Sequence, residues 1–189
     1  MDIFFLKKSE ILKSVSSFDT VYKSEKRNIE YQIGRFLTKY IAKTNFNISD
    51  AEIVVLDKKP IFAHSNMRFS ISHSDEYVVV AFSQKEIGLD VEKFKEKDLE
   101  KFSKYFKKQF NTQEGFYKYC TIYEAKYKSK LENVFEKTFK YNEYYVSIST
   151  LEDDSVKFFE VTNLSDAQTS LENLNLKIHE IKSDLILSV

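Results

Sequence analysis

The stretch FSISHSDEYVVVAFSQKEIGLDVE, residues 69–92, combines strand patterns with an unusual set of polar side chains. Phe69–Ser72 and Tyr77–Phe82 flank a polar turn at residues 74–76, which predicts two strands joined in a hairpin. Ile87–Glu92 predicts a third strand. This part of the chain therefore favours a sheet. In or beside its strand segments it carries His73, Asp90 and Glu92, which a sheet core does not require.

The patterns on either side add helices and further strands. Glu25–Thr44 has apolar residues at three- and four-residue steps, which predicts an amphipathic helix. The other expected elements are a strand at Ile53–Leu56 followed by a turn at Asp57–Pro60, helices at Leu99–Phe110 and Tyr117–Leu131, and strands at Tyr144–Ser149, Val156–Val161, Leu176–Ile181 and Leu185–Val189. This order predicts an α+β chain whose two halves, residues 1–93 and 94–189, are similar in outline.

Composition limits the class of protein. The 189 residues are 42% hydrophobic and 15% aromatic, which predicts a packed globular fold. Acidic and basic residues balance at 29 each, so we expect no nucleic-acid or membrane partner from overall charge. A single cysteine excludes an internal disulfide. The apolar run after Met1 is too short for a signal peptide, and we expect a cytoplasmic protein without a membrane span.

Asp90 and Glu92 are the first candidates for chemistry. On a strand, positions i and i+2 project from the same face, so the two carboxylates lie close together. They repel each other unless a cation lies between them or water solvates both. A divalent ion that prefers oxygen ligands, magnesium above all, would relieve the repulsion. Two solvated acids at the end of a strand are the alternative, and the pair alone does not decide between them.

Three further positions admit both a structural and a functional reading. Glu124 and Lys128 have the i, i+4 spacing of an ordinary ion pair on a helix surface, or could belong to a site. His73 lies between Ser72 and Ser74, a group that could bind an anion through hydroxyl, ring and backbone donors, or serve as a structural histidine. Cys120 has no CxxC partner and is interpreted as a packing residue. Three widely spaced glycines exclude the common glycine-rich phosphate loops.

Taken together, these motifs resemble a known family. KKPIFAHSNMRFSISHSDEYVVVAFSQKEIGLDVE, residues 58–92, resembles the core of the Sfp-type 4′-phosphopantetheinyl transferases, with their G-K-P, F-N-[IV]-S-H-S and G-[IV]-D-[IV]-E motifs. YCTIYEAKYKSK, residues 119–130, is similar to their W-[ST]-x-K-E-[AS]-x-x-K helix. The resemblance is clear from Asp57 to Lys130, loose over the preceding helix with Gly34 and Arg35, and limited to strand-rich character after Leu131.

The resemblance implies a fold and a reaction. The fold would be two similar α/β halves related by a pseudo-twofold axis in one chain, a monomer with the active site between the halves. The reaction would move 4′-phosphopantetheine from coenzyme A to a serine of an apo acyl or peptidyl carrier protein, as in fatty-acid synthesis, and would release 3′,5′-ADP. Magnesium would be required.

The resemblance also implies roles for individual residues. Asp90, Glu92 and Glu124 would bind magnesium, and Glu124 matches the position of the general base for the carrier serine. The remaining matches are to residues that bind coenzyme A or its phosphates: Lys59, Ser72, His73 (at the 3′-phosphate) and Lys128.

The sequence departs from the family pattern at four motif positions. Cys120 replaces a tryptophan, Tyr123 a lysine, Ser70 an asparagine and Lys58 a glycine. The N-terminal basic residues of the family are matched only by candidates, Lys26, Arg27 and Arg35. The segment KFSKYFKKQF, residues 101–110, could dock an acidic carrier protein or simply pack its phenylalanines.

These departures keep two alternatives open. One is a degenerate module that binds coenzyme A or a carrier protein without transfer. The other is an unrelated α+β interaction protein whose acids are all solvated.

Overall fold

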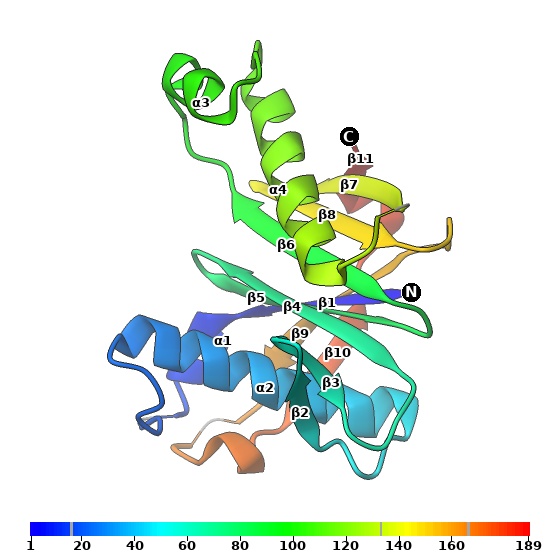
Figure 1. Cartoon of the computed structure of the whole chain (residues 1–189). Helices are drawn as coiled ribbons and strands as arrows, with labels where there is room; N and C mark the ends of the chain where they lie inside the picture. Colours follow the sequence, from blue (N-terminus) through cyan, green and yellow to red (C-terminus); the bar gives the residue numbers. More distant parts are fainter. Residues whose placement is uncertain (16, 133, 166) are drawn as a thin grey trace.

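The protein is a mixed α+β fold, described here from a computed structural model of residues 1–15, 17–132, 134–165 and 167–189 (Figure 1). The helices of this part of the chain are α1 (Lys8–Leu12), α2 (Glu25–Phe46), α3 (Leu99–Phe106) and α4 (Gln113–Ser129), with short 3-10 helices η1 (Leu171–Asn173) and η2 (Ser183–Leu185). The strands are β1 (Asp2–Lys7), β2 (Ile53–Leu56), β3 (Lys59–Phe62), β4 (Arg68–Ser74), β5 (Tyr77–Ser83), β6 (Ile87–Lys93), β7 (Phe135–Tyr141), β8 (Tyr144–Thr150), β9 (Lys157–Asn163), β10 (Leu176–Glu180) and β11 (Ile186–Ser188).

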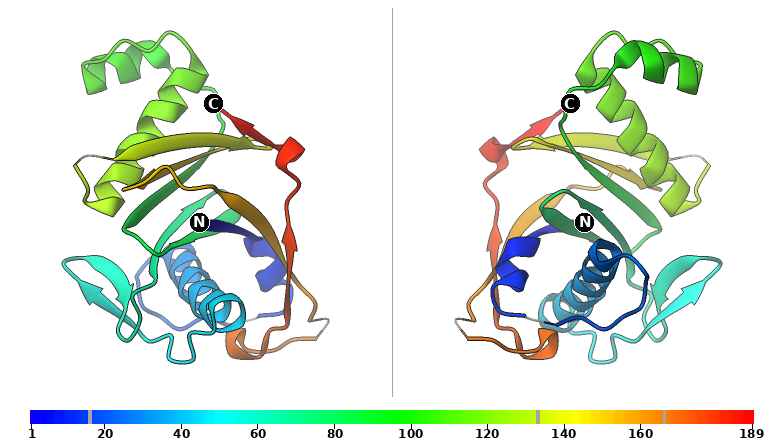
Figure 2. Two further views of the ribbon diagram at one scale, coloured as in Figure 1. Left: turned by 90° about the vertical axis from the view of Figure 1, so that its right-hand side faces the viewer. Right: turned by 90° about the vertical axis from the view of Figure 1, so that its left-hand side faces the viewer.

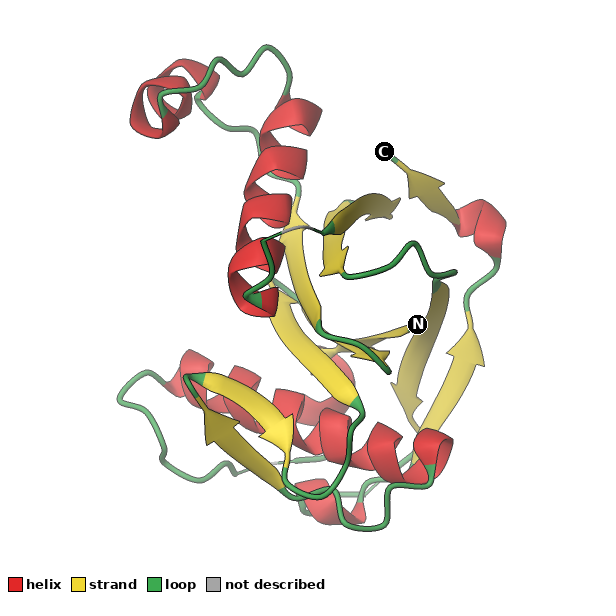
Figure 3. Ribbon diagram, turned by 45° about the vertical axis from the view of Figure 1, so that its right-hand side comes forward, coloured by secondary structure: helices red, strands yellow, loops and turns green. Residues whose placement is uncertain are grey.

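Two sheets form the centre of the fold. The larger has the strand order β10-β9-β1-β5-β4, and the smaller has the order β11-β7-β8-β6. α2 lies against the larger sheet and α4 against the smaller, so the layers run helix, sheet, sheet, helix (Figure 2). The β2–β3 hairpin is separate from both sheets (Figure 3).

Strand alternation divides the apolar residues between two cores. In β1, Phe4 and Leu6 face α2, whereas Ile3 and Phe5 face the smaller sheet. β5 follows the same rule, and all seven of its residues are buried. The central strands therefore lack the polar face of a half-exposed strand, because both of their faces are covered.

The chain crosses between the two predicted halves. β1, β4 and β5 of the larger sheet come before residue 94, whereas β9 and β10 come after it. β9 pairs in parallel with β1, from Asp2 opposite Lys157 to Leu6 opposite Val161. The α+β class is confirmed. The division at residue 93 stays a prediction, and hydrogen-bonded strands connect its two parts.

Most predicted elements are present, with several corrections. The predicted helix at Leu99–Phe110 is too long, because Lys107 adopts a left-handed conformation with φ of 51° and ends α3. α4 begins earlier than Tyr117, since the side chain of Thr112 caps its N-terminus by accepting the N–H of Gly115. Asp57 and Lys58, both with positive φ, form the predicted turn.

Three strands were not predicted, for different reasons. β1 is apolar at consecutive positions because both its faces are buried, so it lacks the alternation of a half-exposed strand. β3 contains Pro60, and the sequence pattern predicts a turn at that position. β7 carries lysines and a glutamate that hide its alternation.

α4 packs very closely on β6, and Gly88 makes this possible. A Cβ atom at Gly88 would lie 1.8 Å from the carbonyl oxygen of Ala125 and 2.7 Å from the backbone nitrogen of Ser129. The helix–sheet interface also uses small polar groups, including a 2.6 Å hydrogen bond between the hydroxyls of Thr121 and Ser147. The glycine thus allows α4 to lie directly over the strand that carries Asp90 and Glu92.

No helix in the described ranges is both long enough and apolar enough to span a bilayer.

Gly88→Ala tests this close approach. Since the clash is with backbone atoms that cannot rotate away, we expect the free energy of unfolding to fall by about 3 kcal/mol. Urea denaturation measures the change. Gly115→Ala is the matched control: its Cβ would meet only a side-chain oxygen, 3.1 Å away, and we expect a change below about 1 kcal/mol. Equal stability of Gly88→Ala and wild type would contradict the close packing.

Candidate functional site

The two sheets meet edge to edge through serine side chains. β4 is an edge strand of the larger sheet and β6 an edge strand of the smaller. Hydroxyls of alternate β4 residues accept hydrogen bonds from alternate backbone N–H groups of β6. The three pairs are Ser70 with Leu89 at 3.0 Å, Ser72 with Val91 at 3.3 Å and Ser74 with Lys93 at 3.0 Å.

This contact replaces a backbone ladder. β6 pairs with β8 along its other edge, so in an antiparallel pair every second N–H points away from β8. The serines supply acceptors for those groups, which would otherwise be unpaired in a partly buried seam. The SxSxS spacing of residues 70–74 therefore sets how the edges of the two sheets meet, next to the apolar core between their faces.

The same hydroxyls position the two strand acids. Ser72 donates to Oδ1 of Asp90 at 2.9 Å, and Ser74 donates to Oε2 of Glu92 at 3.0 Å. Asp90 is only 6% exposed. Lys128 of α4 contacts the same corner: its Nζ lies 2.8 Å from Asp90 Oδ1 and 3.0 Å from Ser72 Oγ. Lys128 is thus a partner of Asp90 in the site.

Glu124 lies along the same helix face. α4 runs along β6 in the opposite direction, with Lys128 beside Asp90 at one end and the Tyr117 hydroxyl bonded to the backbone of Lys95 at the other. Glu124 is between these contacts and is exposed.

The electrostatic surroundings of Cys120 indicate that Asp90, Glu92 and Glu124 lie in the same region. Burial raises the pKa of the Cys120 thiol to about 11, and the charges of Glu92, Asp90 and Glu124 add to the rise. The predicted magnesium ligands are therefore near enough to act on one thiol, which stands at the position where the family pattern has a tryptophan.

The donor set suits a hard cation, although the oxygens are not gathered as tightly as in a filled site. Within the described residues, both polar contacts to Asp90 use Oδ1, which leaves Oδ2 for a metal. Carboxylate oxygens are the preferred ligands of magnesium.

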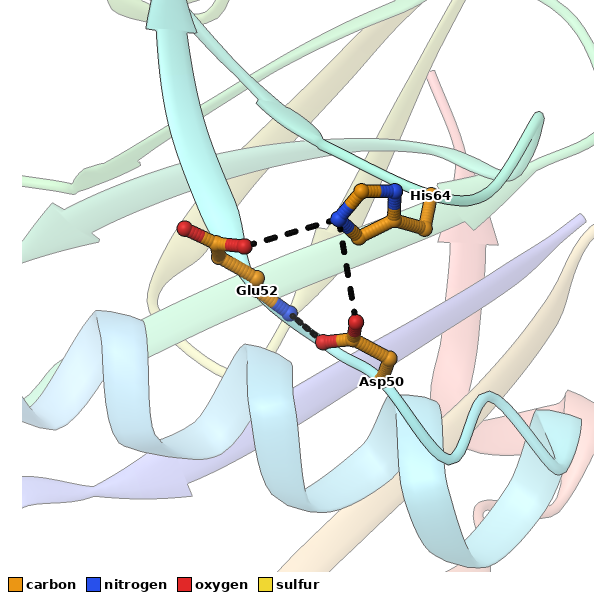
Figure 4. Close-up of side chains that lie close together, drawn as sticks. All are labelled: Asp50, Glu52 and His64. Atoms are coloured by element: carbon orange, nitrogen blue, oxygen red, sulfur yellow. Dashed lines mark hydrogen bonds and ion pairs between the residues drawn. The ribbon is translucent and has the colours of Figure 1, made fainter.

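A tighter cluster of potential ligands lies elsewhere, at the base of the β2–β3 hairpin (Figure 4). Nε2 of His64 is 3.7 Å from Asp50 Oδ2 and 3.6 Å from Glu52 Oε2. The three side chains are about 60% exposed, as expected for a solvated surface pair. This cluster was not predicted, and it shares no residue with the site at β6.

His73 lies on the other face of β4 and is held by a buried acid. Its Nδ1 is 3.3 Å from Oε2 of Glu30, which belongs to α2 and is 5% exposed. Burial lowers the pKa of His73; Glu30 opposes that effect, and Lys128, Lys8 and Lys26 reinforce it. His73 is thus surrounded by lysines and has one acidic partner.

A groove of about 720 Å³ opens between the hairpin, β4 and α4, and we call it the lysine groove. Five lysines line it, together with Tyr127 and other residues: Lys58, Lys59, Lys126, Lys128 and Lys130. The amine of Lys59 is already bonded to Glu86 at 2.5 Å and to the carbonyl of Ile87 at 3.2 Å. Lys128, which also contacts Asp90, is the residue that the groove and the carboxylate site share.

The candidate N-terminal basic residues do not lie together. Lys26 is 3.9 Å from Glu30 and so belongs to the surroundings of His73. Arg27 and Arg35 stack instead on Tyr22 and Tyr31. Lys8 and Glu30 were missed by sequence reasoning, although Lys8 bonds Glu30 at 2.7 Å.

The segment KFSKYFKKQF packs its phenylalanines and exposes its lysines. Phe102, Phe106 and Phe110 contact one another and Phe116 of α4 in a third small core. The four lysines of the segment are exposed. Its phenylalanines therefore serve the fold, whereas its lysines and Tyr105 are open to a partner.

A scan against models of protein families finds no family that matches this chain. A search of curated proteins likewise finds no match.

Ser70→Ala tests the serine contact between the sheets. The substitution leaves the buried N–H of Leu89 without its acceptor, and we expect a loss of about 1–3 kcal/mol in the free energy of unfolding. Chemical denaturation measures it. In the control, Ser65→Ala, water can replace the hydroxyl that accepts the Met67 N–H, and the change should stay within about 0.5 kcal/mol. A loss no greater than the control's would argue against the contact.

Glu92→Gln tests the electrostatic cost of the site. Although the side chain of Glu92 is solvent-exposed, partial desolvation of its carboxylate, followed by the charge of Asp90, raises the pKa of Glu92 above the ordinary value of 4.5. A carboxyl whose pKa is raised by folding loses stability as the pH increases through that pKa. We expect Glu92→Gln to be more stable than wild type near neutral pH, with the difference vanishing below pH about 4.5.

Urea denaturation at both pH values measures the effect, with the exposed Glu100→Gln as control. A Glu92→Gln protein that is less stable than wild type at neutral pH would mean that its contacts with Ser74, Lys97 and Lys128 outweigh the cost of burial.

Proposed function

We propose that this protein transfers 4′-phosphopantetheine from coenzyme A to a serine of an apo carrier protein, in a magnesium-dependent reaction that releases 3′,5′-ADP. The observation that carries the proposal is the position of Lys128, which bonds the buried Asp90 and Ser72 and also lines a groove together with four other lysines. A site that binds a nucleotide diphosphate needs oxygen ligands for the divalent ion and ammonium groups for the phosphates.

The residues divide the work by position. Lys128 would pair with a phosphate oxygen, since it reaches both Asp90 and the groove. The groove lysines would hold the nucleotide part, and His73 with Lys26 and Lys8 would bind the 3′-phosphate. Bound magnesium, held by Asp90, Glu92 and Glu124, would neutralise charge on the diphosphate. Ser72 and Ser74 keep the two strand acids in place.

The transfer itself needs a base for the incoming serine. The serine oxygen forms a bond to the phosphorus that bears pantetheine, the bond from that phosphorus to the bridging oxygen breaks, and 3′,5′-ADP leaves with the electron pair. Glu124 would accept the serine proton, and its exposure on α4 supports this role. The nucleophile comes from the carrier protein, so the chain needs no catalytic serine of its own.

The arrangement of sheets and helices is compatible with the proposed transferase function. A pair of sheets, each covered by one long helix, is compatible with two related halves around a pseudo-twofold axis, which we include in the proposal. The exposed lysines of residues 101–110 and the aromatic side chains of α4 would suit an acidic carrier protein of the acyl or peptidyl type. We propose a cytoplasmic monomer as the acting form.

Glu124→Gln tests the proposed function. Purified protein is incubated with coenzyme A, magnesium and an apo acyl carrier protein, and mass spectrometry follows the gain of one phosphopantetheine. We expect Glu124→Gln to lower the transfer rate by about 100-fold or more, the size typical of a lost general base. Glu114→Gln, at the exposed start of the same helix, should act like wild type.

The outcomes separate the candidate functions. Coenzyme A binding without any mass gain, across acyl and peptidyl carriers, would identify a non-catalytic binding module. No binding of coenzyme A with or without magnesium would favour an interaction protein with solvated acids. Transfer that is unaffected by Glu124→Gln would remove Glu124 from the mechanism.

A further inference from the structure

Glu30 is a buried carboxylate that the proposed reaction does not use. It lies in the second turn of α2, with only 5% of its surface exposed. An ionised carboxylate is costly to bury unless it is paired and hydrogen-bonded. Glu30 is paired three ways: Oε1 with Lys8 at 2.7 Å and Lys26 at 3.9 Å, and Oε2 with His73 at 3.3 Å.

The contact with His73 fixes where the imidazole carries its proton. An ionised carboxylate can only accept hydrogen bonds, so the Nδ1 atom that lies 3.3 Å from Glu30 gains from carrying the proton. The ring is then held with Nε2 on the opposite side, away from α2. In a neutral imidazole, that outward nitrogen carries a lone pair and cannot donate to an anion.

The charges around His73 make the neutral ring the resting form. Burial and the lysines Lys128, Lys8 and Lys26 lower the pKa of His73, and Glu30 is the acid that opposes them. An arriving phosphate would reverse the balance, since it adds negative charge where the lysines gather. Nε2 can bond a phosphate oxygen only after it has taken a proton from solvent.

We propose that Glu30 is a positioning residue: it holds Nδ1 of His73, turns Nε2 toward the 3′-phosphate of coenzyme A, and makes the binding of that phosphate take up a proton. The proposal rests on the function proposed above, because it takes that phosphate as the ligand. Lys8 shares the role by holding the other oxygen of Glu30. The uptake gives the site a preference for the phosphorylated ligand that weakens as the pH rises.

The tautomer of His73 tests the positioning without any ligand. Long-range ¹⁵N–¹H spectra of histidine-labelled protein distinguish the two ring nitrogens, and His73→Gln assigns the signals. We expect protonated Nδ1 in wild type, and a shift toward a mixture of tautomers in Glu30→Gln. Protonated Nε2 in wild type, or identical His73 signals in both proteins, would overturn the positioning role.

Calorimetry tests the coupling to the phosphate. Coenzyme A and dephospho-coenzyme A, which differ only in the 3′-phosphate, are titrated into wild type at pH 8 in two buffers of different ionisation enthalpy. We expect uptake of up to about one proton with coenzyme A and almost none with the dephospho form. Equal uptake with both ligands would overturn the coupling, and this comparison needs no variant.

Variants then connect the coupling to Glu30. We expect Glu30→Gln to bind coenzyme A about tenfold more weakly, to lose the proton uptake, and to keep its affinity for the dephospho form. Glu52→Gln, an exposed acid, should change none of these. A purely structural role would weaken both ligands alike, which contradicts the proposal. If wild type binds neither ligand, the proposed function fails together with the phosphate role, while the ¹⁵N spectra still decide the role of Glu30 toward His73.

Discussion

Three hydroxyl groups connect the two sheets of this protein, and the rest of the arrangement depends on them. A backbone ladder between β4 and β6 would have used the strand edges and left no side chain at the seam. A serine hydroxyl can accept and donate hydrogen bonds at the same time. Each of the three accepts a hydrogen bond from a backbone N–H group of β6 and still has a proton to donate. At Ser72 and Ser74 that proton goes to Asp90 and Glu92. The contact that joins the sheets is therefore also the contact that orients the acids.

The site is costly for the fold, and the structure indicates where. The carboxylate of Asp90 is buried, and the ionised form of Glu92 is disfavoured by desolvation. Gly88 loses more backbone entropy on folding than a larger residue would. The side chains that stabilise the fold lie elsewhere, in the two apolar cores on either face of β1 and β5. A polar seam supported by two dry cores is the arrangement expected where function and stability make opposite demands.

Much of the fold follows from sequence periodicity, whereas the site follows from it only in part. The helix at residues 25–44 and the strands around residues 69–92 are strongly patterned and were predicted closely. β1 was missed because a strand buried on both faces does not alternate. The motifs singled out Asp90, Glu92, Glu124 and Lys128, and the structure brings Lys128 into contact with Asp90. Spacing could not indicate the pairing of Ser72 with Asp90, which depends on how two sheets meet. Glu30 was missed for a similar reason: on an amphipathic helix a glutamate suggests the solvent side, and its burial is explained by Lys8 and His73, which belong to other elements.

The parallel pairing of β1 with β9 has a consequence for the order of events during synthesis. β1 is synthesised long before β9, so one of its edges stays without a neighbour until residues 157–161 have been made. Until then the nascent chain exposes an apolar strand edge of the kind that invites pairing with other chains. The sheet that carries His73 is thus completed late, and a transcript truncated before β9 would yield a polypeptide prone to aggregate rather than a smaller working protein.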